Sequence, residues 1–381
     1  MAGADITRFR IDVEEQQLVD LRERLARTRW PERETVDDWS QGIPLAYLQE
    51  LCEHWRERYD WRRTEAALNG IEQFRTELDG LPIHFMHARS PHEHALPLVI
   101  THGWPGSVVE FFKVIGPLTD PTAHGGEAGD AFHVVCPSLP GYGFSGKPAT
   151  PGWNVERIAS AWAQLMARLG YPRYGAQGGD WGAMVTTALA GVDAEHLAGI
   201  HVNMALADPK ELGALGELSE GEQASLASFA HYARWDAGYS TQQSTRPQTV
   251  GYGLVDSPAA LCGWIVEKFW SWMDCDGHPE NVLTRDELLD NVMLYWLTAA
   301  GASSARLYWE SFRSRDFKAI DLPAGISVFP KEIFRLSRRW AETRFGDLRH
   351  FGELPRGGHF AAMEQPQLFL EEVRAFFRTV R

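Results

Sequence analysis

The sequence predicts an α/β fold in which a mostly parallel central sheet is flanked by helices, with an inserted helical lid and an N-terminal helical meander. Short apolar runs alternate with helix-like segments over residues 73–207 and again over residues 307–381, a rhythm typical of parallel sheets covered on both faces. Residues 208–306 contain no strand pattern, and residues 1–72 contain no α/β repeat. These three observations define a core, a lid and an N-terminal segment.

The N-terminal segment is predicted to contain two amphipathic helices. Leu18, Leu21 and Leu25 recur at helical spacing, and a second apolar face runs through residues 45–57. We therefore expect residues 1–72 to pack against the core and the lid through the apolar faces of these two helices.

The core is expected to begin with a hairpin, because two alternating runs at residues 74–78 and 81–86 flank Asp79-Gly80, a typical hairpin turn. Further strands are predicted where short apolar runs occur, at residues 98–100, 132–136, 174–177, 200–203 and 326–329. Helices are expected at residues 155–169 and 367–379.

The lid is predicted from residues 208–306, which are rich in aromatic side chains. We interpret this stretch as a helical insertion between two strands of a core formed by residues 73–207 and 307–381.

The composition limits the partners and the compartment. A net charge of -14 over 381 residues disfavours nucleic acid and anionic membrane surfaces. The chain has four widely spaced cysteines, no signal-peptide pattern and no apolar run of membrane-spanning length. We expect a soluble cytoplasmic protein, with a homodimer as the default assembly.

The most informative motif is Gly178-Gly179-Asp180-Trp181-Gly182, which directly follows a predicted strand. Small residues on both sides of a central residue are typical of a nucleophile elbow, a sharp turn from strand to helix. A carboxylate in that position can attack a saturated carbon and leave an ester that water cleaves, whereas serine would leave an ether. The alternative is that Asp180 merely caps the next helix.

A second motif, Thr101 to Ser107, follows another predicted strand and contains His102-Gly103-Trp104-Pro105. In the α/β-hydrolase fold, which uses this kind of elbow, such a loop supplies one backbone N–H of the oxyanion hole, and the residue after the nucleophile supplies the other. These donors would be Trp104 and Trp181. Alone, the motif is equally compatible with a tight Gly-Pro turn.

The candidate base is His359, within Gly357-Gly358-His359 near the C-terminus, because nucleophile, acid and histidine follow one another in this order in α/β-hydrolases. Glu332 lies just past a predicted strand, where such enzymes carry the acid that orients the histidine. Asp208, after the preceding strand, is the competing candidate, and a surface carboxylate is the alternative role of Glu332.

Two patterns resemble cofactor sites and are rejected. Residues 141–146 fit G-x-G-x-x-G, but Lys147-Pro148 follows in place of a helix, which excludes the dinucleotide-binding context. His92 and His94 have no further ligand cluster nearby in the sequence. We expect neither a metal nor an organic cofactor.

Taken together, the motifs resemble those of the microsomal-type epoxide hydrolases of the α/β-hydrolase superfamily, in a soluble bacterial form. The resemblance extends from Phe9 to about Val380. It includes N-terminal motifs typical of that branch, Phe9-Arg10-Ile11, Leu25-Ala26-Arg27-Thr28-Arg29-Trp30-Pro31 and Tyr59-Asp60-Trp61-Arg62. It implies an α/β-hydrolase fold. Unlike the mammalian members, this chain is expected to have no N-terminal membrane anchor.

The resemblance also implies further site residues. Two lid tyrosines of the family hydrogen-bond the epoxide oxygen, and they match Tyr239 and Tyr308 here, although an aromatic lid could use either for packing. The substrate pocket is expected to include four residues, His102, Pro105, Trp264 and Phe360. The implied reaction is hydrolysis of an epoxide, bulky and apolar or aryl, to a vicinal diol.

Three alternatives stay open at this point. A haloalkane dehalogenase shares the aspartate elbow, and a tryptophan after the nucleophile, as at Trp181, also binds halide in such enzymes. A non-catalytic relative that binds a ligand is the second alternative. A serine esterase is disfavoured by Asp180 itself.

Overall fold

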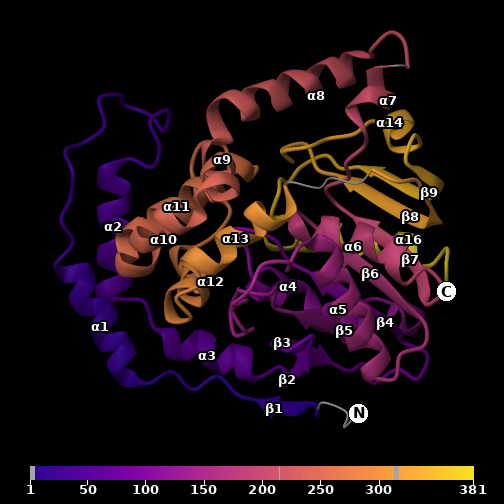
Figure 1. The fold of residues 1–381 in the computed structure, drawn as a ribbon, viewed down its shortest axis with the longest axis horizontal. Helices are drawn as coiled ribbons and strands as arrows, with labels where there is room; N and C mark the ends of the chain where they lie inside the picture. The colour runs from indigo at the N-terminus through magenta and orange to yellow at the C-terminus, as the bar shows by residue number, and fades with distance from the viewer. Residues whose placement is uncertain (1–4, 214, 313–316) are drawn as a thin grey trace.

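The computed structural model describes residues 5–213, 215–312 and 317–381, and these residues form one mixed sheet with helices on both faces (Figure 1). The order of its described strands is β1-β2-β3-β5-β4-β6-β7-β8-β9. Their bounds are β1 (Thr7–Phe9), β2 (Gln73–Leu78), β3 (Leu81–Ala88), β4 (Leu96–Thr101), β5 (Phe132–Pro137), β6 (Tyr174–Gly178), β7 (Leu197–Val202), β8 (Ile320–Val328) and β9 (Phe345–Glu353). The α/β-hydrolase fold expected from the sequence is confirmed.

The sheet is antiparallel from β1 to β5 and parallel from β5 to β9. The expected hairpin joins β2 and β3, with Asp79 at φ 48° and Gly80 at φ 77°. Two positive φ values in a two-residue turn match the twist of the flanking strands. The parallel strands β6 and β7 are buried along their whole length, which explains why exposed polar residues do not alternate with apolar ones along them.

Two pairs of helices cover the sheet. On one face lie α5 (Val155–Arg168) and α6 (Trp181–Val192), and on the other lie α4 (Phe112–Thr119) and α16 (Pro366–Phe377). The apolar stripe of α5 includes Ile158, Trp162 and Leu165, all fully buried. Two short helices, α14 (Arg338–Ala341) and α15 (Ala361–Glu364), complete the C-terminal part.

The lid helices are inserted between β7 and β8 (Figure 1). They are α7 (Pro209–Gly213), α8 (Glu220–His231), α9 (Gly238–Thr245), α10 (Pro247–Asp256), α11 (Pro258–Trp272), α12 (Arg285–Leu297) and α13 (Gly301–Ser311). Helix α13 therefore continues past residue 306, where the sequence places the end of the lid. Among the described residues, no helix is long and apolar enough to cross a membrane.

The N-terminal segment consists of α1 (Glu15–Ala26), α2 (Leu45–Glu57) and α3 (Trp61–Asn69), and it packs along the lid helices α11 and α12 (Figure 1). The ring of Trp39 stacks on Trp270 of α11 at 4.9 Å and 9°. Helix α3 is absent from the sequence-based prediction. Its start is fixed by Asp60, whose side chain accepts a hydrogen bond from the backbone N–H of Arg62.

Candidate active site

The structure places Asp180 in a strained turn between β6 and α6. Its φ of 50° and ψ of -127° are rare for a residue with a side chain. Gly178 and Gly182, on either side of this turn, leave no room for a side chain. A Cβ on Gly178 would lie 2.2 Å from the carbonyl of Gly182, and one on Gly182 would lie 1.8 Å from the carbonyl oxygen of Thr101. The Asp180 side chain makes no capping hydrogen bond to α6, so the capping interpretation is wrong.

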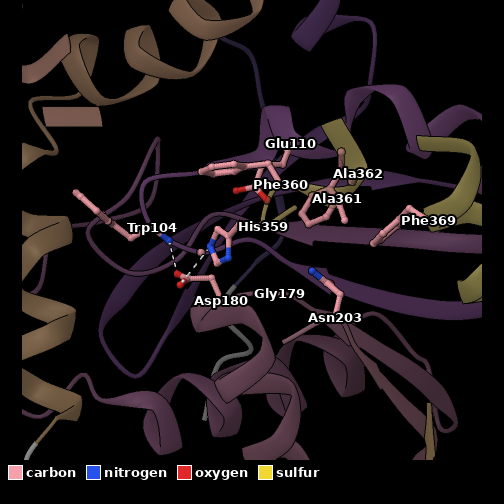
Figure 2. A pocket seen from close by; sticks show the side chains of 12 residues that line it. Trp104, Glu110, Gly179, Asp180, Asn203, His359, Phe360, Ala361, Ala362 and Phe369 are labelled. Atoms are coloured by element: carbon pink, nitrogen blue, oxygen red, sulfur yellow. Dashed lines mark hydrogen bonds and ion pairs between the residues drawn. The ribbon is translucent and has the colours of Figure 1, made fainter. Parts of the chain in front are cut away.

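The two carboxylate oxygens of Asp180 have different partners (Figure 2). The backbone N–H of Trp104 donates to Oδ1 at 2.7 Å. The other oxygen, Oδ2, lies 3.5 Å from Nε2 of His359. Trp181 is the first residue of α6, and N–H groups in the first turn of a helix have no partner within the helix. The backbone N–H of Trp104 thus holds Oδ1, and Oδ2 lies toward His359.

His359 is held between two carboxylates. Its Nδ1 lies 2.7 Å from Oε1 of Glu332, which follows β8, and its backbone N–H donates to the carbonyl of Trp272. The backbone N–H of Ile333 donates to the same Glu332 oxygen at 2.7 Å. The competing candidate, Asp208, accepts a hydrogen bond from the backbone N–H of Lys210 instead. The structure thus brings Asp180, His359 and Glu332 together.

The electrostatics of this group favour a charged imidazole. Burial alone would lower the pKa of His359, but the carboxylates of Glu332 and Asp180 outweigh it and raise the pKa well above its ordinary value. This raised pKa favours the imidazolium form of His359. Conversion of Asp180 to a neutral ester would remove one of the two stabilising charges, and the imidazole would then be able to accept a proton.

Tyr239 of α9 and Tyr308 of α13 lie beside the nucleophile loop. Tyr239 stacks on the Trp104 ring at 4.8 Å, and the ring centroids of the two tyrosines are 5.7 Å apart. Burial, with the charge of Asp180 as a further cause, raises the pKa of both phenols well above 10. Both are therefore neutral hydrogen-bond donors, less acidic than a solvated phenol.

The two hydroxyl groups differ in their partners. The Tyr308 hydroxyl is buried without a hydrogen-bond partner in the protein, a costly arrangement that a substrate oxygen would relieve. The Tyr239 hydroxyl lies 3.0 Å from that of Tyr232. Tyr232 and Trp272, whose ring centroid is 5.1 Å from that of His359, were not anticipated from the sequence, because nothing distinguishes them from the other lid aromatics.

The four expected pocket residues occupy different surroundings. The ring of His102 lies between the carbonyl of Gly103 and the backbone N–H of Leu139, so it braces the loop. The carbonyl of Pro105 accepts from Asn291, and the indole of Trp264 donates to Gln243 within the lid. Phe360 lines a small cavity beside Asp180.

This small cavity also contains two polar residues that were not anticipated, Glu110 and Asn203 (Figure 2). Glu110 follows Val108-Val109 and precedes Phe111-Phe112. A single carboxylate within such an apolar run was the only signal in the sequence. Asn203 directly follows β7 at the same edge of the sheet as Asp180.

Comparisons with known proteins agree with this geometry. Residues 6–111 match the family described as epoxide hydrolase N terminus, and residues 97–235 match the alpha/beta hydrolase fold. The chain is 59% identical to a provisionally named epoxide hydrolase of Stigmatella aurantiaca, covering 99% of this chain and 86% of that protein. It is 35% identical to epoxide hydrolase 1 of Oryctolagus cuniculus, covering 97% of this chain and 88% of that protein.

Solved structures give the same result. The juvenile hormone epoxide hydrolase of Bombyx mori superimposes with a TM-score of 0.91 and 32% identity, covering 99% of this chain and 95% of that one. The Aspergillus niger epoxide hydrolase superimposes with a TM-score of 0.89 and 33% identity, covering 100% of this chain and 98% of that one. With the aspartate elbow and its histidine in place, the chain belongs to the epoxide hydrolase family.

Proposed function

We propose that this epoxide hydrolase opens its substrate through a covalent ester on Asp180. Oδ2 of Asp180 attacks an epoxide carbon, and the C–O bond of the ring breaks. The hydroxyl groups of Tyr239 and Tyr308 donate hydrogen bonds to the epoxide oxygen, which stays on the neighbouring carbon and becomes an alcohol when one of the two phenols transfers its proton. The observation that supports this step most directly is the buried, unpartnered hydroxyl of Tyr308.

The ester is then hydrolysed by water. The imidazolium of His359 first gives up its proton, which restores the phenol that protonated the epoxide oxygen. His359, oriented by Glu332, then removes a proton from water while the water oxygen bonds to the carboxyl carbon of Asp180. The backbone N–H groups of Trp104 and Trp181 stabilise the resulting oxyanion, each contributing roughly 3 kcal/mol. The C–O bond to the substrate breaks, the diol leaves with the proton from His359, and the carboxylate is restored. No metal or organic cofactor takes part in this scheme.

The substrate is proposed to be a bulky apolar or aryl epoxide. The rings of Trp104, Trp181, Tyr239, Tyr308 and Trp272 form a connected aromatic cluster beside Asp180, and apolar pockets with few polar groups select such ligands. Four free, buried cysteines fit a reducing compartment, which supports a cytoplasmic enzyme. A homodimer stays the default expectation.

The two-step scheme is tested by a single turnover in H₂¹⁸O with excess enzyme. The first diol should carry unlabelled oxygen, and the label should appear in the peptide that contains Asp180. Label that enters the first diol directly from the solvent would contradict the covalent intermediate.

The dehalogenase alternative is separated from this reaction by a direct assay. Both reactions use an aspartate, but only the epoxide oxygen requires a proton, which the two tyrosines supply. Styrene oxide should be consumed, and a bromoalkane of similar size should not release bromide.

A further inference from the structure

A small cavity lies beside the Asp180 carboxylate, and none of the described aromatic residues of the lid lines it. Among the described residues, all those that line it belong to the core, and none lies between 208 and 306. They include Asp180, His359, Glu110 and Asn203. In Figure 2, Asn203 and Phe369 lie on the side of His359 that faces away from Trp104. The nucleophile therefore has a lid side, with the tyrosines, and a core side, with this cavity.

Glu110 brings a carboxyl group to the core side. It lies in the short helical turn Val108–Phe111, and its Oε1 would be 1.3 Å from a Cβ on Gly106, so only glycine permits its position. Glu110 keeps part of its surface accessible, which fits its place in the cavity wall. Burial nevertheless raises its pKa to about 8, with the charge of Asp180 adding to the rise and that of His359 opposing it. This raised pKa favours the protonated form of Glu110, which can both donate and accept a hydrogen bond.

Asn203 is fixed opposite, at the end of β7. Its Oδ1 accepts a hydrogen bond from Nε2 of Gln177 at 2.9 Å. Its Nδ2 would lie 2.8 Å from a Cβ on Gly179, the residue before the nucleophile. The amide group is therefore turned so that its two N–H donors lie at the elbow. Together with Glu110 and Nε2 of His359, it offers the two to four polar partners that a bound water molecule needs.

We infer that the core-side cavity is the site of the hydrolytic water, and that Glu110 and Asn203 position this water for attack on the ester carbon of Asp180. The inference rests on the proposed two-step function. The substrate then occupies the lid side, and the water approaches the same carboxyl carbon from the core side. The water oxygen bonds to that carbon, its proton goes to Nε2 of His359, and the diol leaves toward the lid.

The test separates the two steps in rapid-mixing single turnovers. Glu110→Leu removes the polar group at similar size, and ester hydrolysis should slow roughly 10- to 100-fold because the water is misplaced. Ester formation should keep its rate, so that ester accumulates as a protein mass increase equal to the substrate. Glu110→Gln, which retains a neutral donor and acceptor, should recover most of the hydrolysis rate. Glu371→Leu, on the exposed face of α16, is the control for the same chemical change.

Equal slowing of both steps, or no slowing of hydrolysis, would overturn the positioning role of Glu110. If Glu110→Leu does not fold, Asn203→Ala provides the same test with the same expected selective loss. His359→Gln distinguishes this inference from the proposed function: if that variant forms no ester with a substrate that the wild type turns over, the two-step scheme fails. If it traps the ester while Glu110→Leu hydrolyses normally, only the role of the cavity fails.

Discussion

At the level of single residues, the negative charge of Asp180 links the two steps of the proposed mechanism. It lies 3.5 Å from His359 and is one of the two charges that raise the pKa of that imidazole. While the charge is present, the raised pKa favours the protonated form of His359, which cannot act as a base. When an ester neutralises Asp180, the imidazolium loses part of its stabilisation. In the proposed mechanism, His359 thus becomes available as a base at the step in which water is activated.

This coupling predicts the effect of Asp180→Asn. The substitution keeps the shape but removes the negative charge, so the pKa of His359 should fall and turnover should cease. The measurement is an NMR titration of ¹³C-labelled histidine rings. His196, whose pKa is raised mainly by its hydrogen bond to Asp193, serves as an internal control and should not shift. An unchanged titration of His359 would contradict the coupling.

A second residue-level prediction concerns the lid tyrosines. Tyr308→Phe removes a hydroxyl that is buried without a protein partner, so folding should be retained. Loss of a proton donor should slow ester formation roughly 100-fold or more, while hydrolysis of preformed ester keeps its rate. Tyr252→Phe, at a tyrosine that is 69% exposed on α10, is the matched control. Equal rates of ester formation in both variants would exclude Tyr308 as a donor.

At the level of elements, the site depends on the close approach of the histidine loop to the end of α11. The backbone N–H of His359 donates to the carbonyl of Trp272 at 2.9 Å. A Cβ on Gly358 would lie 2.3 Å from that same oxygen. Gly357 has a φ of 104°, which favours glycine on conformational grounds. The paired glycines therefore let the lid hold the base in position.

Gly358→Ala should consequently displace His359 without unfolding the core. We expect a loss of kcat of roughly 100-fold, because misplacing a catalytic group by about 1 Å has this cost. Gly253→Ala in α10, where a Cβ meets nothing within 4 Å, should retain full activity. Circular dichroism checks that both variants keep their helices. Normal turnover by Gly358→Ala would show that the contact with Trp272 is not needed.

At the level of the whole molecule, the N-terminal segment ties the lid in place. The buried carboxylate of Asp290 on α12 accepts hydrogen bonds from Tyr59, Arg63 and Thr64. The indole of Trp55 also contacts the sulfur of Met293 on the same helix. Since α12 and α13 are adjacent in the chain, this interface supports the helix that carries Tyr308.

Asp290→Leu should therefore destabilise the protein by roughly 2–4 kcal/mol, because it leaves buried donors without an acceptor. The change is measured as a lower midpoint in thermal and urea unfolding. Asp256→Leu, at a side chain that is 83% exposed in its ion pair with Arg24, should change stability by no more than about 1 kcal/mol. Equal stability of the two variants would contradict the role of Asp290.

Much of the fold was predictable because the spacing of apolar residues, which differs between strands and helices, can be read from short stretches of the sequence. The predicted hairpin, the parallel strands and α2 all occur, with bounds that differ by a few residues. Strands β1 and β9 were not predicted. Strand β1 has only three residues, and β9 is partly exposed with the polar sequence FGDLRHFGE. Both are edge strands whose pairing depends on a distant partner.

The sequence by itself determined the family and predicted the residues of the proposed chemistry, because an aspartate elbow, a His-Gly-Trp-Pro loop and a glycine-flanked histidine are local patterns tied to particular turns. Only the tertiary structure decided which groups meet across long separations. It joined Glu332 to His359, left the hydroxyl of Tyr308 unpaired, and placed Glu110 on the core side of Asp180. Distances and burial of this kind depend on how the lid, the loops and the sheet edge pack together, and no local pattern encodes that packing.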